Sequence, residues 1–282
     1  MNAIEVENVT YTYPDAPRPA LEGVSIGIGR GRLVAVMGEG GSGKSTLLRL
    51  LNGIIPHALG GRMEGRVRVL GHDTPERSVA WLSQRVGMVL ENPDVQLFTD
   101  TVRSEVAFGP ENLGRPRDEI LASIDWALDL VGLKGVEDRP PAELSGGQKQ
   151  RLAIAAVLAT RPEVLVLDEP TSQIDQPGAV SIFKSILRLK DELGLTIVVA
   201  TNDVSSVAEF ADEVIVLRGG RIAGTGTPAR VFSDETLAST TGRPQTIRVA
   251  LSLYARGLPC TDRPVRFAEC RDTLAGLFQR RC

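Results

Sequence analysis

The sequence is poor in aromatic residues and has no long apolar run. Aromatic residues make up only 4% of the 282 residues, so we expect a core of Val, Ile, Leu and Ala. No stretch approaches the roughly 18 apolar residues that a membrane-spanning helix needs. Residues 1–10 also lack the basic region and apolar stretch of a secretory signal. We therefore expect a cytosolic protein that contacts any membrane through partners or a surface.

An excess of positive charge is absent as well. The 32 Lys and Arg residues are balanced by 35 Asp and Glu residues, which gives a formal net charge of -3. Proteins that bind nucleic acids electrostatically usually carry a basic excess or a basic stripe. We therefore expect no nucleic-acid partner.

Cysteine and histidine are too few and too scattered to indicate a metal or redox centre. Cys260, Cys270 and Cys282 lie near the C-terminus, whereas His57 and His72 lie far upstream. This spacing matches no zinc motif, and cytosolic thiols stay reduced. We expect no metal or redox role for the three cysteines.

What the sequence does contain is an alternation of short apolar strands and helices. The runs typical of buried strands are residues 34–37, 164–167, 196–200 and 214–217. The helical patterns include residues 44–52, 148–159 and 179–193. Such alternation indicates an α/β fold with a mostly parallel, helix-covered sheet. Residues 4–9 and 24–28 alternate in polarity, which predicts a small N-terminal antiparallel β layer against that sheet.

Two further segments differ from this core. Helices dominate between about residues 93 and 160, so we predict a helical subdomain inserted into the α/β core. After Pro228 the chain changes to short helical pieces and turns. We therefore divide the chain into a domain of residues 1–228 and a C-terminal extension of residues 229–282.

Residues 38–45, with the sequence GEGGSGKS, fit the phosphate-loop pattern G-x-x-x-x-G-K-[ST] between a strand and a helix. The glycines let backbone N–H groups turn inward around phosphates, and the helix N-terminus adds its positive dipole end. Lys44 offers a charge to the β- and γ-phosphates, and Ser45 offers a hydroxyl to Mg²⁺. Glu39 is unexpected beside an anion. The alternative is a Gly-rich turn that happens to precede Lys-Ser. The candidate ATP contacts here are Gly38, Glu39, Gly40, Gly41, Ser42, Gly43, Lys44, Ser45 and Thr46.

The strand at residues 164–167 ends in two acidic residues. Asp168 is placed to hold Mg²⁺ through water, and Glu169 to polarise an attacking water as a general base. A buried strand that ends in Asp-Glu is common, so this pattern gains its weight from the phosphate loop. Together the two motifs predict a Mg²⁺-ATP site.

A third motif, LSGGQ, places a second candidate anion-binding nest at the start of a helix. Its residues are Leu144, Ser145, Gly146, Gly147 and Gln148. The three motifs in this order resemble the ATPases of ABC transporters over about residues 3–225. The resemblance implies a RecA-like P-loop NTPase core and two cassettes that pair head to tail. Each ATP then lies between one P-loop and the LSGGQ segment of the other cassette.

The same resemblance suggests two more nucleotide-site residues. Tyr13 looks like the aromatic residue that stacks on adenine, although a core or turn tyrosine is the alternative. Residues 172–175 look like the loop that crosses the dimer interface, with Asp175 as its acidic residue.

A narrower resemblance is to the ATPases of energy-coupling-factor importers for cobalt, nickel and vitamins. It rests on residues 91–98 (ENPDVQLF), residues 105–114 (EVAFGPENLG), residues 51–53 (LNG) and the tail from Gly226. It implies a transmembrane coupling subunit, a separate membrane protein that captures the substrate, and a peripheral position at the cytoplasmic face of the membrane. Residues 92–98 would form part of the groove for the coupling subunit, and the tail a second dimer contact.

Two positions depart from the family pattern. Glu91 stands where the family has a glutamine that helps bind Mg²⁺ and senses nucleotide. Because glutamate is also a hard oxygen ligand, we expect metal binding to survive, with the extra charge acting on nucleotide affinity or closure. The candidate metal ligands are thus Ser45, Glu91 and Asp168, and the candidate catalytic residues are Glu169, Asn202 and Glu91.

Asn202 stands where the family has a histidine that contacts the γ-phosphate. Asparagine donates only a neutral hydrogen bond, roughly half as strong as a charge-assisted one. A misplaced acid–base group costs about 10²–10⁴-fold in rate. One hypothesis is that the site on this P-loop hydrolyses slowly and that the LSGGQ segment completes a competent site on a different partner. The alternative is that Asn202 is tolerated in a homodimer.

Three functions therefore compete. The first is an importer ATPase, and the second is an attenuated cassette that binds ATP and donates its LSGGQ segment to a partner ATPase. The third is a cassette that acts in translation or DNA repair. The single P-loop and the absence of a coiled-coil heptad run between Gly43 and Leu144 argue against the third.

Overall fold

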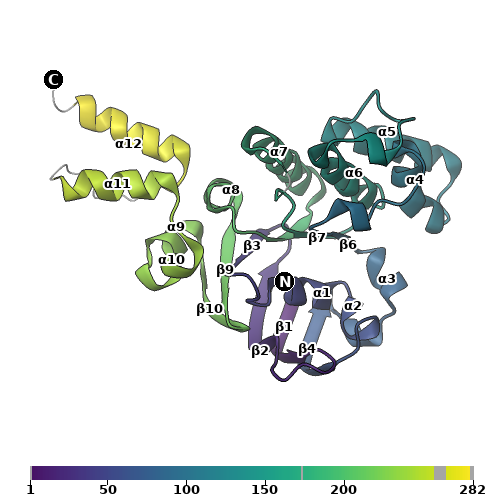
Figure 1. Cartoon of the computed structure of the whole chain (residues 1–282), viewed down its shortest axis with the longest axis horizontal. Coiled ribbons are helices and arrows are strands. Elements are labelled where there is room, and N and C mark those ends of the chain that lie inside the picture. The colour runs from purple at the N-terminus through teal and green to yellow at the C-terminus, as the bar shows by residue number, and fades with distance from the viewer. Residues whose placement is uncertain (1, 173, 257–264, 280–282) are drawn as a thin grey trace.

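The computed structural model describes residues 2–172, 174–256 and 265–279, which form two sheets and the helices around them (Figure 1). The strands of the larger sheet are β3 (Leu33–Met37), β6 (Val86–Val89), β7 (Val164–Asp168), β8 (Thr196–Ala200), β9 (Glu213–Arg218) and β10 (Arg221–Gly226). Their spatial order is β10-β9-β3-β8-β7-β6. All neighbours pair in parallel except β9 and β10, which pair antiparallel. The predicted mostly parallel sheet is confirmed.

Two strands of this sheet were not indicated by the sequence. β6 has only four residues, one of them Gly87, so it lacks a clear apolar run. A Cβ atom at Gly87 would lie 2.3 Å from Val157 Cγ1, so close packing against the following helical segment requires glycine there. β10 is half-exposed at the sheet edge and contains two glycines, which hides it as well. Both strands are therefore set by their neighbours rather than by their own sequence pattern.

The smaller sheet is antiparallel, as predicted, and contains β1 (Asn2–Thr12), β2 (Leu21–Gly29), β4 (Arg62–Val69) and β5 (His72–Asp73) in the order β2-β1-β4-β5. Its buried side chains share one core with α1 (Lys44–Leu51) and one face of the larger sheet. Val34 and Val36 of β3 point into this core. Leu33, Ala35 and Met37, which alternate with them, point into the second core on the opposite face.

Helices occupy the segment between β6 and β7, where the sequence predicts a helical subdomain. They are η2 (Pro93–Val95), α4 (Val102–Asn112), α5 (Arg117–Val131), η3 (Pro141–Glu143) and α6 (Gly146–Leu158). Figure 1 shows α4, α5 and α6 packed together at one end of the molecule. α7 (Gln176–Leu193) and α8 (Val204–Phe210) follow β7 and β8 and close the second core.

The remaining helices are short connections and the C-terminal extension. η1 (Thr74–Glu76), α2 (Ile54–His57) and α3 (Val79–Ser83) lie between α1 and β6. The extension contains α9 (Pro228–Ser233), α10 (Glu235–Thr241), α11 (Gln245–Ala255) and α12 (Phe267–Gln279), with α11 beside α12 at the end of the molecule opposite α4–α6 (Figure 1). Cys270 is buried on α12, and the predictions for Cys260 and Cys282 lie outside the described residues. In the part of the chain described, no helix is long and apolar enough to cross a membrane.

Candidate functional site

The loop of residues 38–43 connects β3 to α1 through conformations that only glycine adopts easily. Gly43 has φ of 103° at the N-cap of α1, and a Cβ atom there would lie 2.8 Å from the carbonyl oxygen of Ala20. At Gly38 a Cβ atom would lie 2.3 Å from the carbonyl oxygen of Leu217 on β9. Close contact with neighbouring backbone therefore fixes the path of the loop.

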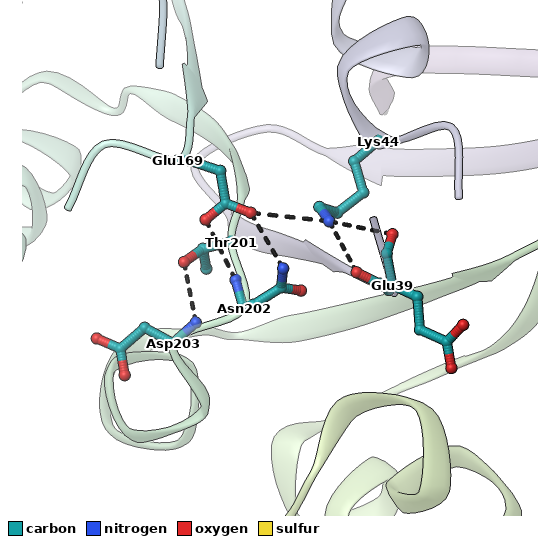
Figure 2. A network of polar contacts seen from close by, with 7 residues as sticks. Glu39, Lys44, Glu169, Thr201, Asn202 and Asp203 are labelled. Atoms are coloured by element: carbon teal, nitrogen blue, oxygen red, sulfur yellow. Dashed lines mark hydrogen bonds and ion pairs between the residues drawn. The ribbon is translucent and has the colours of Figure 1, made fainter. Parts of the chain in front are cut away.

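The side chain of Lys44 is buried at the start of α1. Its Nζ donates to the carbonyl oxygen of Gly38 at 2.7 Å and lies 3.7 Å from Oε1 of Glu169. Figure 2 shows the Glu39 carboxylate pointing away from the ammonium, with only the Glu39 backbone oxygen directed at it. Because the Glu39 carboxylate points away, Glu169 supplies the one carboxylate among the described residues that pairs with the Lys44 ammonium.

Among the described residues, two buried oxygen atoms near this loop have no hydrogen-bond partner. Asp168, the last residue of β7, is 4% exposed, and its Oδ1 accepts no hydrogen bond from a described residue. The hydroxyl of Ser42, also 4% exposed, is likewise unpaired. Buried polar atoms are nearly always paired, so both fit a polar ligand. A hydroxyl can donate to a phosphate, and a carboxylate oxygen suits Mg²⁺ or its bound water.

Glu169 follows β7 in a left-handed backbone conformation, with φ of 44°, which is uncommon for a residue with a side chain. Its N–H donates to the carbonyl oxygen of Ala200 at 2.8 Å. Burial raises the pKa of this carboxyl above its usual value, and the negative charges of Asp168 and Glu91 add to the increase. The nearby Lys44 charge opposes it. Glu169 is thus a carboxylate held beside the phosphate loop with a strengthened affinity for a proton.

Asn202 lies against Glu169 from the end of the neighbouring strand β8 (Figure 2). Its backbone N–H donates to Oε2 of Glu169 at 3.4 Å, and its Nδ2 donates to Oε1 at 3.3 Å. Thr201 ties this loop to the phosphate-loop strand, since its N–H donates to the carbonyl oxygen of Val36 at 3.1 Å. Thr201 Oγ1 also accepts from the N–H of Asp203, which caps α8. The sequence analysis missed Thr201 and Asp203, although the Asp before a helical segment signals an N-cap.

Glu91 is exposed in the turn between β6 and η2. Its turn is held by two glutamines that the sequence analysis did not single out. Gln96 accepts from Leu90 N–H at 3.0 Å, and its Nε2 donates to the Met88 carbonyl at 3.2 Å. Gln150 of α6 donates to the Leu90 carbonyl at 3.4 Å. The turn that carries Glu91 therefore links β6 to the helical subdomain.

Tyr13 lies just after β1 and next to α1. Its hydroxyl is 3.1 Å from Thr46 Oγ1 and accepts from Arg49 at 3.3 Å. The ring meets Tyr11 edge to face, with 4.9 Å between centroids. The half-buried ring is thus fixed beside the helix that follows the phosphate loop.

The LSGGQ segment and Asp175 both begin helices. Ser145 Oγ accepts from the N–H of Gln148, whose side chain accepts from the N–H of Ser145, which forms a capping box on α6. Asp175 caps α7 by accepting from the N–H of Gly178 at 3.1 Å. A Cβ atom on Gly147 would lie 3.8 Å from Ile174, so these two segments are neighbours.

The predicted site residues therefore form two groups. One contains the phosphate loop, Asp168, Glu169 and Asn202, at the carboxyl ends of β3, β7 and β8. The other contains the LSGGQ segment and the loop before Asp175. The two groups are joined where Ser172, in the loop before Asp175, donates its N–H to the carbonyl oxygen of Glu169 at 3.1 Å. Among the described residues, no hydrogen bond or ion pair links the LSGGQ segment to the phosphate loop. This sheet order, with a phosphate loop after β3 and the acidic pair Asp168-Glu169 at the end of β7, defines a P-loop nucleotide-binding protein.

The comparisons with known proteins identify the family. The sequence profile of the ABC transporter family matches residues 21–172, and the chain belongs to this family. It is 45% identical to the energy-coupling factor transporter ATP-binding protein EcfA1 of Lacticaseibacillus paracasei over 82% of this chain and 81% of that protein. It is 42% identical to EcfA1 of Symbiobacterium thermophilum over 98% of each chain. The chain is thus an ATP-binding, ATP-hydrolysing transport ATPase similar to energy-coupling factor ATPases.

Solved structures give the same result. The chain resembles CbiO1 of Clostridium perfringens, part of the ABC transporter complex CbiONQ, with a TM-score of 0.77 and 36% identity over 91% of this chain and 97% of that one. It also resembles a dimeric ATP-binding cassette in a post-hydrolysis state bound to ADP and Pi. That match has a TM-score of 0.71 and 27% identity, and covers 80% of this chain and 98% of the other.

Proposed function

We propose that this chain is the ATPase subunit of an energy-coupling-factor importer for a vitamin or a transition-metal ion. It works as a peripheral protein on the cytoplasmic face of the membrane. The observation that carries the proposal is that Glu169 contacts both Lys44 and Asn202 beside the phosphate loop. The chain is also similar to EcfA1 over nearly its whole length. The geometry supports ATP hydrolysis, and the relatives support its use in import.

Mg²⁺ is the metal that the donor set fits. The unpaired Asp168 carboxylate oxygen, the Ser45 hydroxyl and the Glu91 carboxylate are hard oxygen donors, which Mg²⁺ prefers. In the part of the chain that the structure describes, no group of three or more His, Cys, Asp or Glu side chains could hold a metal by itself. This agrees with an ion that also needs the phosphate oxygens of ATP. When bound, Mg²⁺ neutralises charge on the phosphates.

Glu169 is the residue we assign as general base. Its Oε1 lies 3.7 Å from Nζ of Lys44. A γ-phosphate bound at the loop would attract the Lys44 ammonium, and Oε1 of Glu169, then held only by Asn202 Nδ2, would be able to accept from the attacking water as well. A raised pKa brings Glu169 closer to the working pH, and this improves a general base. Asn202 keeps the other carboxylate oxygen in position through its backbone N–H.

The site is completed, in this proposal, by a second ABC ATPase in a head-to-tail dimer. The LSGGQ nest and Asp175 lie apart from the P-loop within one chain, so they are free to face the nucleotide of the partner. The partner is a second copy or a different ATPase. The C-terminal extension of residues 229–282 supplies a second dimer contact through α11 and α12, whose described residues expose Val249, Tyr254 and Phe267.

A groove between the α/β core and the helical subdomain is the proposed seat of the transmembrane coupling subunit. Its volume is about 330 Å³, and it is lined by side chains of α3, β6, α4 and α6. Phe98 and Phe108 lie at its wall, 65% and 43% exposed, and meet edge to face. Glu105, buried beside them, accepts from the N–H groups of Phe98 and Thr99 and holds this wall. A membrane protein that captures the substrate completes the importer.

Replacing Phe98 tests this assignment. We expect Phe98→Asp to weaken assembly with the transmembrane subunit of its importer by about 30-fold, as for a central interface residue worth about 2 kcal/mol. Leu193→Asp is the matched control, because Leu193 is 49% exposed at the end of α7, away from the groove. Co-purification and light scattering of the complex measure the effect. Equal assembly of the two variants would contradict the groove assignment.

A second candidate function is an attenuated cassette that binds ATP and donates its LSGGQ segment to a partner ATPase. The observation that favours it is Asn202, a neutral side chain whose amide is already engaged with Glu169. In that case the site on this P-loop turns over slowly and the partner site carries most of the hydrolysis.

A further inference from the structure

A basic pocket adjoins the groove. Its volume is about 400 Å³, and we call it the arginine pocket. Its lining residues are Gln84, Arg85, Leu113, Arg115, Arg161 and Glu163. Three guanidinium groups thus face one space in a protein whose net charge is negative. Such a local reversal of sign points to an anionic ligand.

Two of the three guanidinium groups are held against tryptophan rings. Arg161 lies 3.6 Å from the centroid of the Trp126 ring, and Arg85 lies 3.9 Å from that of Trp81. Arg85 also donates to the backbone oxygen of Trp81 at 3.3 Å. The chain has only two tryptophans, so both support an arginine of this pocket. Stacking fixes the plane of each guanidinium and leaves edge N–H groups for an anion.

The carboxylates around the pocket do not neutralise it. Glu163 pairs with Arg30 at 3.5 Å, and Glu119 pairs with Arg115 at 3.8 Å, in each case between exposed side chains. Such exposed pairs are weak. Within the ranges that the structure describes, neither Arg85 nor Arg161 forms an ion pair. The two stacked arginines therefore keep their full charge for a ligand.

The pocket lies beside the groove. Ser83 lines the groove, and the next residue, Gln84, lines the pocket. Thr160 lines the groove and also an intervening cavity that contains Arg115 and Arg161 of the pocket. If the groove receives a transmembrane subunit, as the proposed function holds, this pocket lies on the membrane side of the protein. The inference rests on the proposed function for that orientation.

We propose that the arginine pocket binds the phosphate of an anionic phospholipid headgroup at the membrane surface. A guanidinium group binds phosphate oxygens through two parallel hydrogen bonds. One phosphate has enough oxygens to bind two arginines in this way, whereas one carboxylate can bind only one. The cytoplasmic leaflet also attracts basic residues, by about 5-fold in affinity for each Lys or Arg near its surface. The pocket thereby orients the ATPase on the bilayer beside its transmembrane partner.

The two tryptophans make the test direct. The full chain is titrated with vesicles of phosphatidylcholine alone and of equal parts phosphatidylcholine and phosphatidylglycerol, while tryptophan emission and vesicle flotation are followed. We expect binding and an emission change only with phosphatidylglycerol. The double variant Arg115→Gln, Arg161→Gln should bind about 30-fold more weakly. The control variant Arg62→Gln, Arg188→Gln removes the same charge from exposed sites elsewhere and should bind as the parent does.

Several outcomes would overturn the proposal. Equal losses in the two double variants would mean that only net charge matters. An emission change with inorganic phosphate but no vesicle binding would assign the pocket to a soluble anion. Normal vesicle binding by the pocket variant, with failed assembly with the transmembrane subunit, would assign it to protein carboxylates. Thermal unfolding checks that each variant folds, and the parallel variant Arg115→Lys, Arg161→Lys tests the loss of the guanidinium fork at unchanged charge. None of these readouts requires ATP, so they are independent of the ATPase assignment.

Discussion

At the residue scale, the chemistry is concentrated in one contact network. Glu169 touches Lys44 of the phosphate loop and Asn202 of the next strand, and its backbone is held in an unusual conformation between them. Strained backbone of this kind persists only where the surroundings hold it in place. The network explains how a carboxylate can be held partly buried here, ready to accept a proton.

The raised pKa of Glu169 has a consequence for stability. A carboxyl whose pKa is higher in the folded state stabilises the fold at low pH, and this contribution is lost as pH rises through the folded-state pKa. We therefore expect Glu169→Gln to raise the Tm at neutral pH without nucleotide, with a difference that shrinks as pH falls below the usual value of 4.5. Calorimetry across this range measures it, with Glu64→Gln as an exposed control. A lower Tm for Glu169→Gln at neutral pH would show that the attraction to Lys44 outweighs burial.

Asn202 gives a second prediction at this scale. A charged histidine in its place can replace a neutral hydrogen bond to the γ-phosphate with a charge-assisted one, worth about 1–1.5 kcal/mol more. We expect Asn202→His to raise ATP turnover of the assembled transporter by about tenfold, and Asn202→Ala to lower it. Unchanged or lower turnover in the histidine variant would rule out attenuation by Asn202.

At the element scale, helix N-termini organise both halves of the proposed nucleotide site. α1 receives the phosphate loop, α6 begins at the LSGGQ capping box, and α7 begins at Asp175. Ser145 and Asp175, which we assign to the interface with a partner, are thus also the N-caps at which α6 and α7 begin. Their contribution to folding can be measured separately from any contact with a partner.

Asp175 offers that measurement. Asp175→Ala removes the acceptor for the N–H of Gly178, so we expect a loss of about 0.5–2 kcal/mol in the free energy of unfolding of the nucleotide-free chain. Asp175→Asn retains an acceptor, so its free energy of unfolding should fall by a few tenths of a kcal/mol at most. Urea unfolding measures both variants. Equal losses for the two would show that the charge, and not the cap, stabilises α7.

Some strands and site residues could be predicted from the sequence, and others could not. The strands β3, β7, β8 and β9 are continuous apolar runs, so their pattern alone identifies them. β6 and β10 were missed because glycine and exposed positions interrupt their patterns, and only neighbouring strands define them. The motif residues were singled out because their types are tied to phosphate chemistry, and their roles remain predictions. Thr201, Gln96 and Gln150 were missed because they act through backbone groups that only the folded chain brings near.

At the scale of the whole molecule, the proposed dimer divides each nucleotide site between two chains. The phosphate loop and the LSGGQ segment belong to separate parts of the fold, and among the described residues no hydrogen bond or ion pair joins them. A solved relative is a dimeric cassette bound to ADP and Pi. We propose that ATP-dependent pairing of two chains brings the LSGGQ segment of one chain to the phosphate loop of the other, with the groove and the arginine pocket facing the membrane.

The most direct test measures ATP hydrolysis by the purified chain against Glu169→Gln, with dimerisation followed by light scattering. We predict Mg²⁺-dependent turnover in the parent chain, reduced about 10²–10⁴-fold in the variant. The variant should still bind ATP and accumulate as a dimer. Turnover that is unchanged by Glu169→Gln would contradict the assignment of the general base. ATP binding without turnover in the parent chain would instead favour an attenuated subunit that needs a different ATPase partner.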